Sequence, residues 1–536
     1  MSSGTEGGVS IYEHIRAHLP LDGPGLTEGG DRLPDEPEEE DELPQIVLAP
    51  GLRDRILESG SVVDSEQAAA RSFRLFKAVV RKPFSNRRYE ELHEDLRTNE
   101  LTGFLDPLVG RVYHSGLSRD AVRELALRLV SSSPHRMPVK VGICVLGLCA
   151  RHEDREILLT LGRHEEFSHY VGVTMTNALP YPEESLWQLA KVVQGWGRVA
   201  FIEQLASTQR PEIKAWLLRD GFASSFLWTE LASIAATTGE LARELRADGI
   251  DDELYLSAGR IIRELIRSRM SETTEDVEDY EDAPEAIRLF LQHVARRKEH
   301  LESFEPVAAI VDYLEMRRSS FDRFEEHWSE EGRARAAQRL RSRWVDEERT
   351  RVATHARWIL HRPAWRRAID EGLRSADHWT FALAEEAARW LGDDTVPLMV
   401  ARLREHPDDD HTWFEVARLA DGGQFDELLE MARDRVARHE PDAEEWGPRW
   451  TIGIHQEVER FPGMGWPLFR AELESPILRD RHYGLSGLAR LADASWPDEA
   501  DAIVETISRS DPDEEIRTRA RDLLSKRTKE GTDAHR

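Results

Sequence analysis

The sequence predicts an all-α fold, an α-solenoid of stacked antiparallel helix pairs that follows a disordered acidic N-terminal arm. The first observation is a repeat, because residues 140–145 (KVGICV) return 30 positions later as residues 170–175 (YVGVTM). A unit of this length cannot bury its apolar face alone, so its repetition favours stacked units that share one long core. The second observation is that short segments of helical periodicity, separated by Gly, Pro and Asp breaks, occupy most of the chain.

Composition and charge favour an elongated, acidic, helical protein. At 536 residues the chain is too long for one ordinary compact core, and no sharp change of composition divides it. With 101 acidic and 72 basic residues the formal net charge is -29. Such a surface repels nucleic-acid phosphates and anionic membranes and attracts basic surfaces. We therefore expect a protein partner with a basic face, and neither nucleic acid nor a membrane.

Cysteine usage and the absence of long apolar runs indicate a cytoplasmic protein. Only Cys144 and Cys149 are present, and their spacing of five places them on different sides of a helix, so neither a disulfide framework nor a zinc site follows. The N-terminus has no basic region followed by an apolar stretch, and the longest apolar run, residues 141–150, is too short to span a bilayer.

The first 50 residues combine Gly and Pro with the acidic run 35–42 (DEPEEEDE). This composition cannot bury enough apolar area to offset the entropy of ordering, so a disordered arm is expected, with a short helix over residues 11–18 as the exception. The acidic run is typical of a solvated tail, and an acidic docking motif is the alternative.

Residues 51–270 are expected to form N-terminal helical repeats. Apolar residues at helical spacing predict a helix from Ser65 that ends before Pro83, and Ser118 is suited to cap the start of another. Pro-Tyr-Pro, Gly-Trp-Gly and Thr-Thr-Gly breaks then separate further helices, at residues 184–193, 198–206, 211–219 and 226–245.

The second half of the chain is expected to contain an acidic exposed loop, a helical block and further repeats. Residues 271–285 (SETTEDVEDYEDAPE) lack apolar periodicity and predict the loop. Residues 286–370 form a middle block of longer helices, and residues 371–526 form C-terminal repeats whose helices end in similar Ala-Arg-Trp/Leu stretches before Asp or Gly. A disordered tail is expected at 527–536.

The best match to a known repeat lies near the C-terminus, where Asp513, Ile516, Arg517 and Ala520 have the spacing D-x-x-[VI]-R-x-x-A. The chain here resembles bacterial HEAT-type helical repeat proteins, and residues 122–126 (VREL A) are a shorter match. The resemblance implies that Ile516 and Ala520 face the preceding helix and that the Arg reaches an acidic turn of the next repeat. It covers residues 118–246 and 376–525, and the middle block departs from it.

In an alternative interpretation of the fold, residues 139–149 and 169–176 form buried parallel strands, because Val and Ile are frequent in both. Gly142, Gly147 and Gly172 would weaken strands, whereas they permit close contact between helices, and no Gly-rich phosphate loop follows either segment.

No motif predicts a catalytic residue, a metal or a cofactor. His164 and His169 are five apart, whereas zinc peptidases need two His four apart on one helix. The pairs Glu90/His93 and Glu166/His169 have the spacing of di-iron ligands, but an acidic sequence contains such pairs by chance. The loop 406–411 (HPDDDH) is suited to hold a divalent cation or to cap a helix that begins near Thr412.

The strongest local anomaly is the basic segment 333–367 within an acidic protein. Three interpretations remain open: core Trp with Arg paired to acidic helices, a site for an acidic element such as the chain's own arm, or a nucleic-acid site. Trp344 and Trp358 are spaced to share one helix face, and Pro363 moves Trp365 onto another segment. The candidate binding residues are Arg339, Arg343, Trp344, Arg357, Trp358, Arg362, Trp365 and Arg366.

These features favour a non-enzymatic protein–protein interaction scaffold or adaptor that presents a concave helical surface, an inference by analogy of fold. One alternative is a nucleic-acid-directed helical-repeat protein that uses residues 333–367. The other is a helical metal-dependent enzyme.

Overall fold

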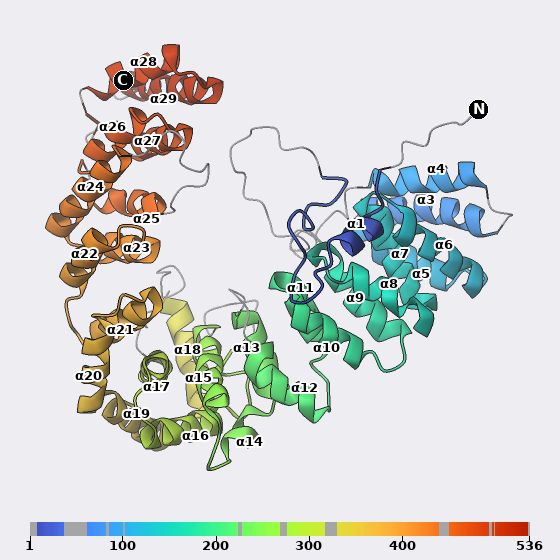
Figure 1. The fold of residues 1–536 in the computed structure, drawn as a ribbon, viewed down its shortest axis with the longest axis horizontal. Coiled ribbons are helices and arrows are strands. Elements are labelled where there is room, and N and C mark those ends of the chain that lie inside the picture. Colours follow the sequence, from blue (N-terminus) through green and yellow to red (C-terminus); the bar gives the residue numbers. More distant parts are fainter. Residues whose placement is uncertain are drawn as a thin grey trace. The chain divides into compact units, whose positions relative to one another are not determined.

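A computed structural model shows a chain built from helices, arranged in two units, residues 1–362 and 363–536 (Figure 1). The structure describes residues 8–36, 62–81, 85–99, 102–222, 228–268, 276–316, 330–438, 450–461, 463–491, 496–497 and 499–533. Within these ranges every regular element is a helix. None of the described helices combines the length and the apolar character that crossing a membrane requires.

The first unit stacks its helices in two layers. Helices α7, α9 and α11 pack in succession, and α13, α15, α17 and α19 continue the series, while α8, α10, α14 and α16 pack beside them. The helices of this unit are α1 (Ile11–Ala17), α3 (Val62–Val80), α4 (Asn86–Arg97), α5 (Leu105–Tyr113), α6 (Arg119–Ser132), α7 (Arg136–Cys149), α8 (Arg155–Leu161), α9 (Glu165–Ala178), α10 (Glu183–Val192), α11 (Gly195–Gln204), α12 (Pro211–Trp216), α13 (Trp228–Thr238), α14 (Leu241–Leu245), α15 (Asp252–Arg267), α16 (Ala283–Arg296), α17 (Phe304–Leu314), α18 (Glu330–Arg343) and α19 (Asp346–Leu360).

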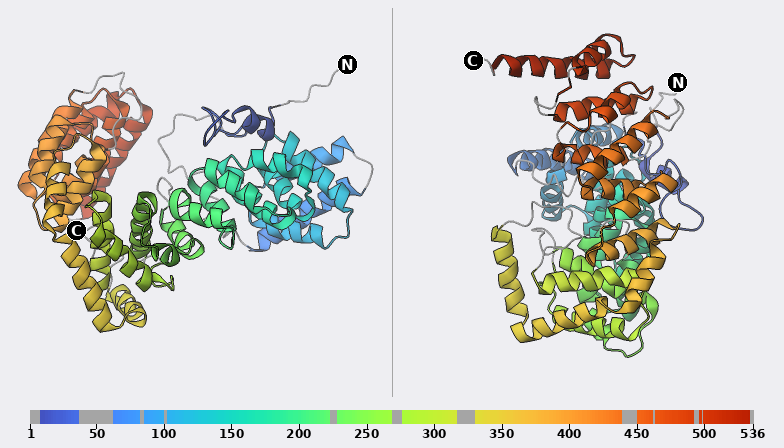
Figure 2. Two further views of the ribbon diagram at one scale, coloured as in Figure 1. Left: turned by 60° about the horizontal axis from the view of Figure 1, so that its bottom comes forward. Right: turned by 90° about the vertical axis from the view of Figure 1, so that its left-hand side faces the viewer.

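The second unit consists of helix pairs stacked on one another (Figure 2). The pairs α20–α21, α22–α23, α26–α27 and α28–α29 each pack closely, and α23–α25 and α24–α26 connect neighbouring pairs. Paired packing of this kind is compatible with the expected α-solenoid. The helices are α20 (Pro363–Gly372), α21 (His378–Trp390), α22 (Val396–Glu405), α23 (Asp410–Leu419), α24 (Gly422–Val436), α25 (Trp450–Glu457), α26 (Trp466–Leu473), α27 (Leu478–Arg490), α28 (Ala500–Ser510) and α29 (Glu514–Asp533).

Both copies of the 30-residue repeat are helices, α7 and α9, so the alternative with parallel strands is wrong. Small residues allow the helices to approach closely, since a Cβ added at Gly142 would lie 2.6 Å from Val130 Cγ1 of α6. Thr174 of α9 donates a hydrogen bond of 2.8 Å to the carbonyl of Ile143 in α7. This bond satisfies a buried hydroxyl between the two helices.

Residues 8–36 differ from the expectation of a disordered arm. Ile11 and Ile15 of α1 are fully buried, and α1 packs against α6 and α8. The segment ends on α7, where Asp35 accepts a hydrogen bond of 2.7 Å from the backbone N–H of Arg136. The short helix expected at residues 11–18 is present as α1, whose seven residues make about two turns and bury two Ile side chains. The composition of the arm did not indicate that this helix packs on the rest of the unit. Residues 37–61 lie outside the described part of the chain.

The described part of the expected acidic loop 271–285 is a partly buried turn, residues 276–282, followed by the start of α16. Asp276, Val277 and Tyr280 are all buried. The Tyr280 hydroxyl accepts a hydrogen bond from the backbone N–H of Ala242, and the N–H of Val277 donates to the carbonyl of Leu265. The turn therefore joins α14, α15 and α16 within one unit, and the division of the chain falls between residues 362 and 363 rather than here.

Several smaller boundaries also follow from local chemistry. Ser118 caps α6 as predicted, since its side chain accepts from the N–H of Ala121. The predicted helix 226–245 is interrupted at Glu240, whose φ of 56° separates α13 from α14. The expected tail 527–536 instead continues α29 as far as Asp533, because no Pro ends the helix there.

The contacts of the repeat signature agree with the expectation in part. Ile516 and Ala520 are fully buried, and Arg123 of the shorter match bonds Asp154 in the turn before α8. Arg517 donates to the carbonyls of Asp511 and Pro512 in its own preceding turn. Its expected contact with the turn of a following repeat stays a prediction, because α29 is the last helix of the described residues.

Candidate functional site

The basic segment 333–367 meets the acidic turn 276–282. Arg339 of α18 forms ion pairs with Asp276, at 2.6 Å, and with Asp279, at 2.9 Å. Arg343 donates two hydrogen bonds to the carbonyl of Glu278. Burial lowers the pKa of the Arg339 guanidinium, but the carboxylates outweigh it and keep the pKa above its usual value. The acidic turn therefore neutralises Arg339 and holds Arg343 through a backbone carbonyl.

The two Trp residues of α18–α19 do not share a face, so that prediction is wrong. Trp344 is only 3% exposed and its indole N–H donates to the Tyr313 hydroxyl at 3.2 Å. Trp358 is 58% exposed and stacks on His355. The helical spacing does not extend across both residues, because the chain leaves the helix at Trp344 and Val345 between α18 and α19.

The remaining candidate residues are also engaged inside their own unit. Arg357 pairs with Glu315. Arg362 pairs with Glu299 at 2.8 Å and donates to the carbonyl of Ala295. In the second unit, Pro363 begins α20 as predicted, Trp365 is fully buried and Arg366 pairs with Asp393. The structure thus favours internal pairing for this segment, and a binding role for its residues stays a prediction.

A second basic segment, residues 71–88, was missed by the sequence interpretation. It contains seven basic residues and no acidic residue, whereas 333–367 contains Asp346, Glu347 and Glu348. The uninterrupted run of one sign was the signal that could have identified it. The basic residues are Arg71, Arg74, Lys77, Arg81, Lys82, Arg87 and Arg88.

A groove of about 820 Å³ lies along α3 beside this segment. Two of its arginines are held by carboxylates, Arg71 by Asp95 at 2.5 Å and Arg111 by Glu66. Arg74 is exposed and, within the described ranges, its side chain makes neither a hydrogen bond nor an ion pair. The lining residues are Gln67, Ala68, Ala70, Arg71, Phe73, Arg74, Asn99 and Arg111, which we call the basic groove.

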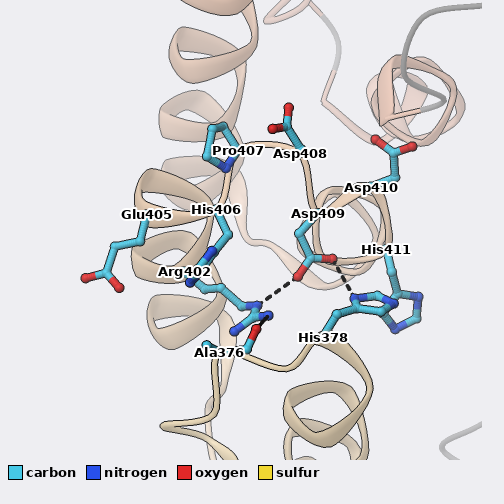
Figure 3. Close-up of a pocket in the computed structure, with 10 residues that line it drawn as sticks. All are labelled: Ala376, His378, Arg402, Glu405, His406, Pro407, Asp408, Asp409, Asp410 and His411. Atoms are coloured by element: carbon cyan, nitrogen blue, oxygen red, sulfur yellow. Dashed lines mark hydrogen bonds and ion pairs between the residues drawn. The ribbon is translucent and has the colours of Figure 1, made fainter.

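A pocket of about 600 Å³ in the second unit is built around the loop 406–411 (Figure 3). Asp409 caps α23 by accepting from the N–H of Thr412, and it also accepts from Arg402 at 2.8 Å and faces His378 at 3.1 Å. Burial raises the pKa of the Asp409 carboxyl, but Arg402 and Thr412 outweigh it and hold the pKa below its usual value. The helix-capping interpretation of this loop is confirmed.

The rim of this pocket is acidic and aromatic. Glu405, Asp408 and the half-exposed Asp410 line the pocket, and Figure 3 shows Glu405 and Asp408 pointing away from the central Arg402–Asp409 pair. The next residue along α21, Trp379, is 70% exposed and packs against the His378 ring at 5.2 Å between centroids. We call Glu405, Asp408, Asp410 and Trp379 the acidic rim.

The carboxylate–histidine pairs noted in the sequence have other roles. Glu166 forms an ion pair of 2.5 Å with the buried Lys140, and His93 lies 2.9 Å from the Ser133 hydroxyl. Across the described ranges, no group of three or more His, Cys, Asp and Glu side chains is arranged to hold a metal ion.

Comparisons with protein-family models, with curated proteins and with solved structures found no match to this chain.

Proposed function

We propose that the protein is a non-enzymatic interaction scaffold, a HEAT-like helical-repeat protein that binds a protein partner with a basic face through the acidic rim. The observation that carries the proposal is the exposure of Trp379, which packs against His378, a residue of the pocket that Glu405, Asp408 and Asp410 also line. Trp is enriched at energetically dominant interface positions, and its ring attracts Lys and Arg side chains. The carboxylates of the pocket would select a basic partner.

The supporting geometry is rigid at its centre. Arg402 donates to Asp409 and to the carbonyls of Ser375 and Ala376, which fixes the starts of α21 and α23 next to each other. Asp408 is further held by Arg435 of α24 at 2.5 Å. A binding surface that is ordered before association loses less entropy when the partner arrives. The net charge of -29 adds long-range attraction for a basic surface.

The HEAT-like description rests on the stacked helix pairs and on the buried Ile516 and Ala520. Arg481 of α27 also supports it, because this Arg bonds Asp511 of the next turn at 2.9 Å as well as the carbonyls of Ser475 and Pro476. Arg517 repeats the contacts with its own turn. Arg481 thus connects the turn before α27 to the turn before α29.

The nucleic-acid alternative has less support in segment 333–367. Arg339, Arg343 and Arg357 are bonded to carboxylates or carbonyls of the chain, so a phosphate would have to displace these partners.

The test uses a fluorescent twelve-residue peptide of Lys, Arg and Leu as the probe. We expect salt-sensitive binding to the full chain, weakened about tenfold by Trp379→Ala, because an exposed aromatic anchor typically contributes more than 1 kcal/mol. Trp358→Ala is the matched control, since Trp358 is also exposed but lies in the first unit. Equal binding by wild type and Trp379→Ala would contradict the proposal.

A further inference from the structure

The basic residues of α3 form one stripe along the helix. Positions 71, 74, 77 and 81 recur at intervals of three and four, which places them on one side of an α-helix. Arg71, Arg74 and Arg81 are exposed and Lys77 is half-buried. The stripe begins in the basic groove and continues beyond it toward the end of α3.

Two arginines of the groove are anchored and are therefore oriented. Asp95 accepts from Arg71 through one carboxylate oxygen and from the Ser72 hydroxyl through the other. Arg71 also donates to the side-chain carbonyl of Asn99 at 3.4 Å. A guanidinium has five N–H donors in a rigid fork, so an arginine held at one edge keeps donors for a second carboxylate.

The other cations of the stripe have no carboxylate. Within the described ranges, the side chains of Arg74 and Arg81 make no hydrogen bond or ion pair, and the Lys77 ammonium lies 5.8 Å from the centroid of the Phe73 ring. Like charges held along one helix face repel each other, which destabilises the helix slightly unless an anion is bound. In a protein with a net charge of -29, such a surface is the exception.

We propose that the basic groove and the stripe that continues it bind a short acidic segment of a partner protein. From Gln67 in the groove to Arg81 at the end of the stripe, the helix spans about 21 Å at about 1.5 Å per residue, which matches about six residues of extended chain at about 3.4 Å each. Arg71, Arg74 and Arg81 bind the carboxylates of alternate side chains, and Phe73 packs against their methylene groups.

The size of the stripe selects a short acidic peptide over nucleic acid. A long polyanion would extend past α3 onto a surface whose excess of 101 acidic over 72 basic residues repels it. A segment of about six residues remains on the groove and the stripe. This site differs in sign and position from the acidic rim, so the scaffold would hold partners of opposite charge, and the two proposals can fail separately.

The experiment measures binding of a labelled eight-residue peptide, DEPEEEDE, to the full chain by fluorescence anisotropy. We expect saturable binding that weakens as salt rises from 50 to about 300 mM, because the charges are exposed. Arg74→Gln with Arg81→Gln should weaken it at least about tenfold, while the melting temperature stays unchanged, since neither residue has a partner to lose.

Two controls and two rival outcomes make the test decisive. The matched variant Arg341→Gln with Arg351→Gln removes two exposed arginines of segment 333–367 and should bind as wild type. The peptide NQPQQQNQ should not bind. Equal losses in both variants, or tighter binding of a single-stranded DNA of equal charge, would overturn the proposal.

The chain's own acidic run is the remaining rival occupant. A full-length variant with residues 38–42 changed to Gln and Asn removes five of its carboxylates. If only this variant binds the peptide, the run at 37–42 already occupies the groove in the wild type, and the proposal of a separate partner is wrong. Equal binding by wild type and this variant supports it.

Discussion

Segments 71–88 and 333–367 are both rich in basic residues, but their arginines differ in the partners that the structure gives them. Both are rich in Arg, both carry aromatic residues, and both stand out in an acidic protein. In 333–367, Arg339 and Arg343 are bound to the acidic turn 276–282. In 71–88, Arg74 and Arg81 are exposed and lack such partners within the described ranges.

The difference shows that a basic run indicates a binding surface only when its counter-charges are known. The carboxylate that pairs with Arg339 belongs to Asp276, 63 residues earlier in the chain. A side-chain pair so distant depends on how α15, α16 and α18 pack, and no local pattern reports it. By contrast, the absence of any acidic residue in 71–88 was visible in the sequence, and it is the better indicator of an unneutralised surface.

The largest expected effect is the loss of folding stability on replacing a buried Trp of segment 333–367, compared with replacing an exposed Trp of the same segment. Trp344→Ala leaves a cavity and removes the hydrogen bond to Tyr313, so it should lower the free energy of unfolding by about 3 to 5 kcal/mol. Trp358→Ala should change it by less than about 1 kcal/mol, since its ring is exposed. Urea denaturation of both variants measures this, and equal losses would mean that the two residues are equivalent.

The next effect tests whether the ion pairs hold the fold. Arg339→Gln with Arg343→Gln leaves the Asp276 carboxylate buried without its cation and should cost about 3 kcal/mol. The double variant Arg341→Gln with Arg351→Gln is the control, expected within about 0.5 kcal/mol of wild type. Unchanged stability in the first variant would show that the acidic turn does not need these arginines.

The smallest expected effect compares a carboxylate that is held in an ion pair with its neighbour in the chain. Glu166 is paired with Lys140, whereas Glu165 packs against Gly195, and burial, followed by the charge of Asp31, raises the pKa of Glu165 from 4.5 to about 7. The pKa of Glu165 is higher in the folded protein than in the unfolded chain, so protonation of this carboxyl favours folding. Its contribution to stability is fully present below pH 4.5 and is lost as the pH rises through 7. Glu165→Gln should therefore stabilise the protein by about 1 kcal/mol at pH 8, allowing for partial exposure, and little near pH 5.

Thermal unfolding at the two pH values checks this expectation. Glu166→Gln is the control, because it leaves the buried Lys140 without its partner and should destabilise the protein at both. An identical response of both variants at pH 8 would contradict the contrast between a paired and an unpaired carboxylate.

Much of the fold was predictable because it rests on local patterns. The repeat at Val141 and Val171 identified two packed helices, and Ser118 marked the start of a third. Three features were not predictable because, like the ion pair between Arg339 and Asp276, they join residues that are far apart in the sequence. The docking of Ile11 on α6 and α8, the burial of Tyr280 and the break at Trp344 all depend on contacts with distant helices.

The candidate sites also combine features that the local sequence predicts with features that depend on packing. The capping role of Asp409 could be proposed from its position before a helix, whereas the exposure of Trp379 could not, because a Trp in the first turn of a helix is equally compatible with burial. The basic stripe on α3 could have been predicted from the sequence by counting the acidic residues near each basic run.

The most direct test of the central claim compares the reactivity of individual arginines with phenylglyoxal, followed by peptide mapping with mass spectrometry. An exposed guanidinium without a carboxylate should react at least about tenfold faster than one held in an ion pair, a difference of about 1.4 kcal/mol in activation free energy. We expect Arg74 and Arg81 to be modified before Arg339 and Arg362, which should be protected. Equal rates for these two pairs, or faster modification of Arg339 and Arg362, would contradict the claim that Arg74 and Arg81 are open to a partner whereas Arg339 and Arg362 are held by the chain's own carboxylates.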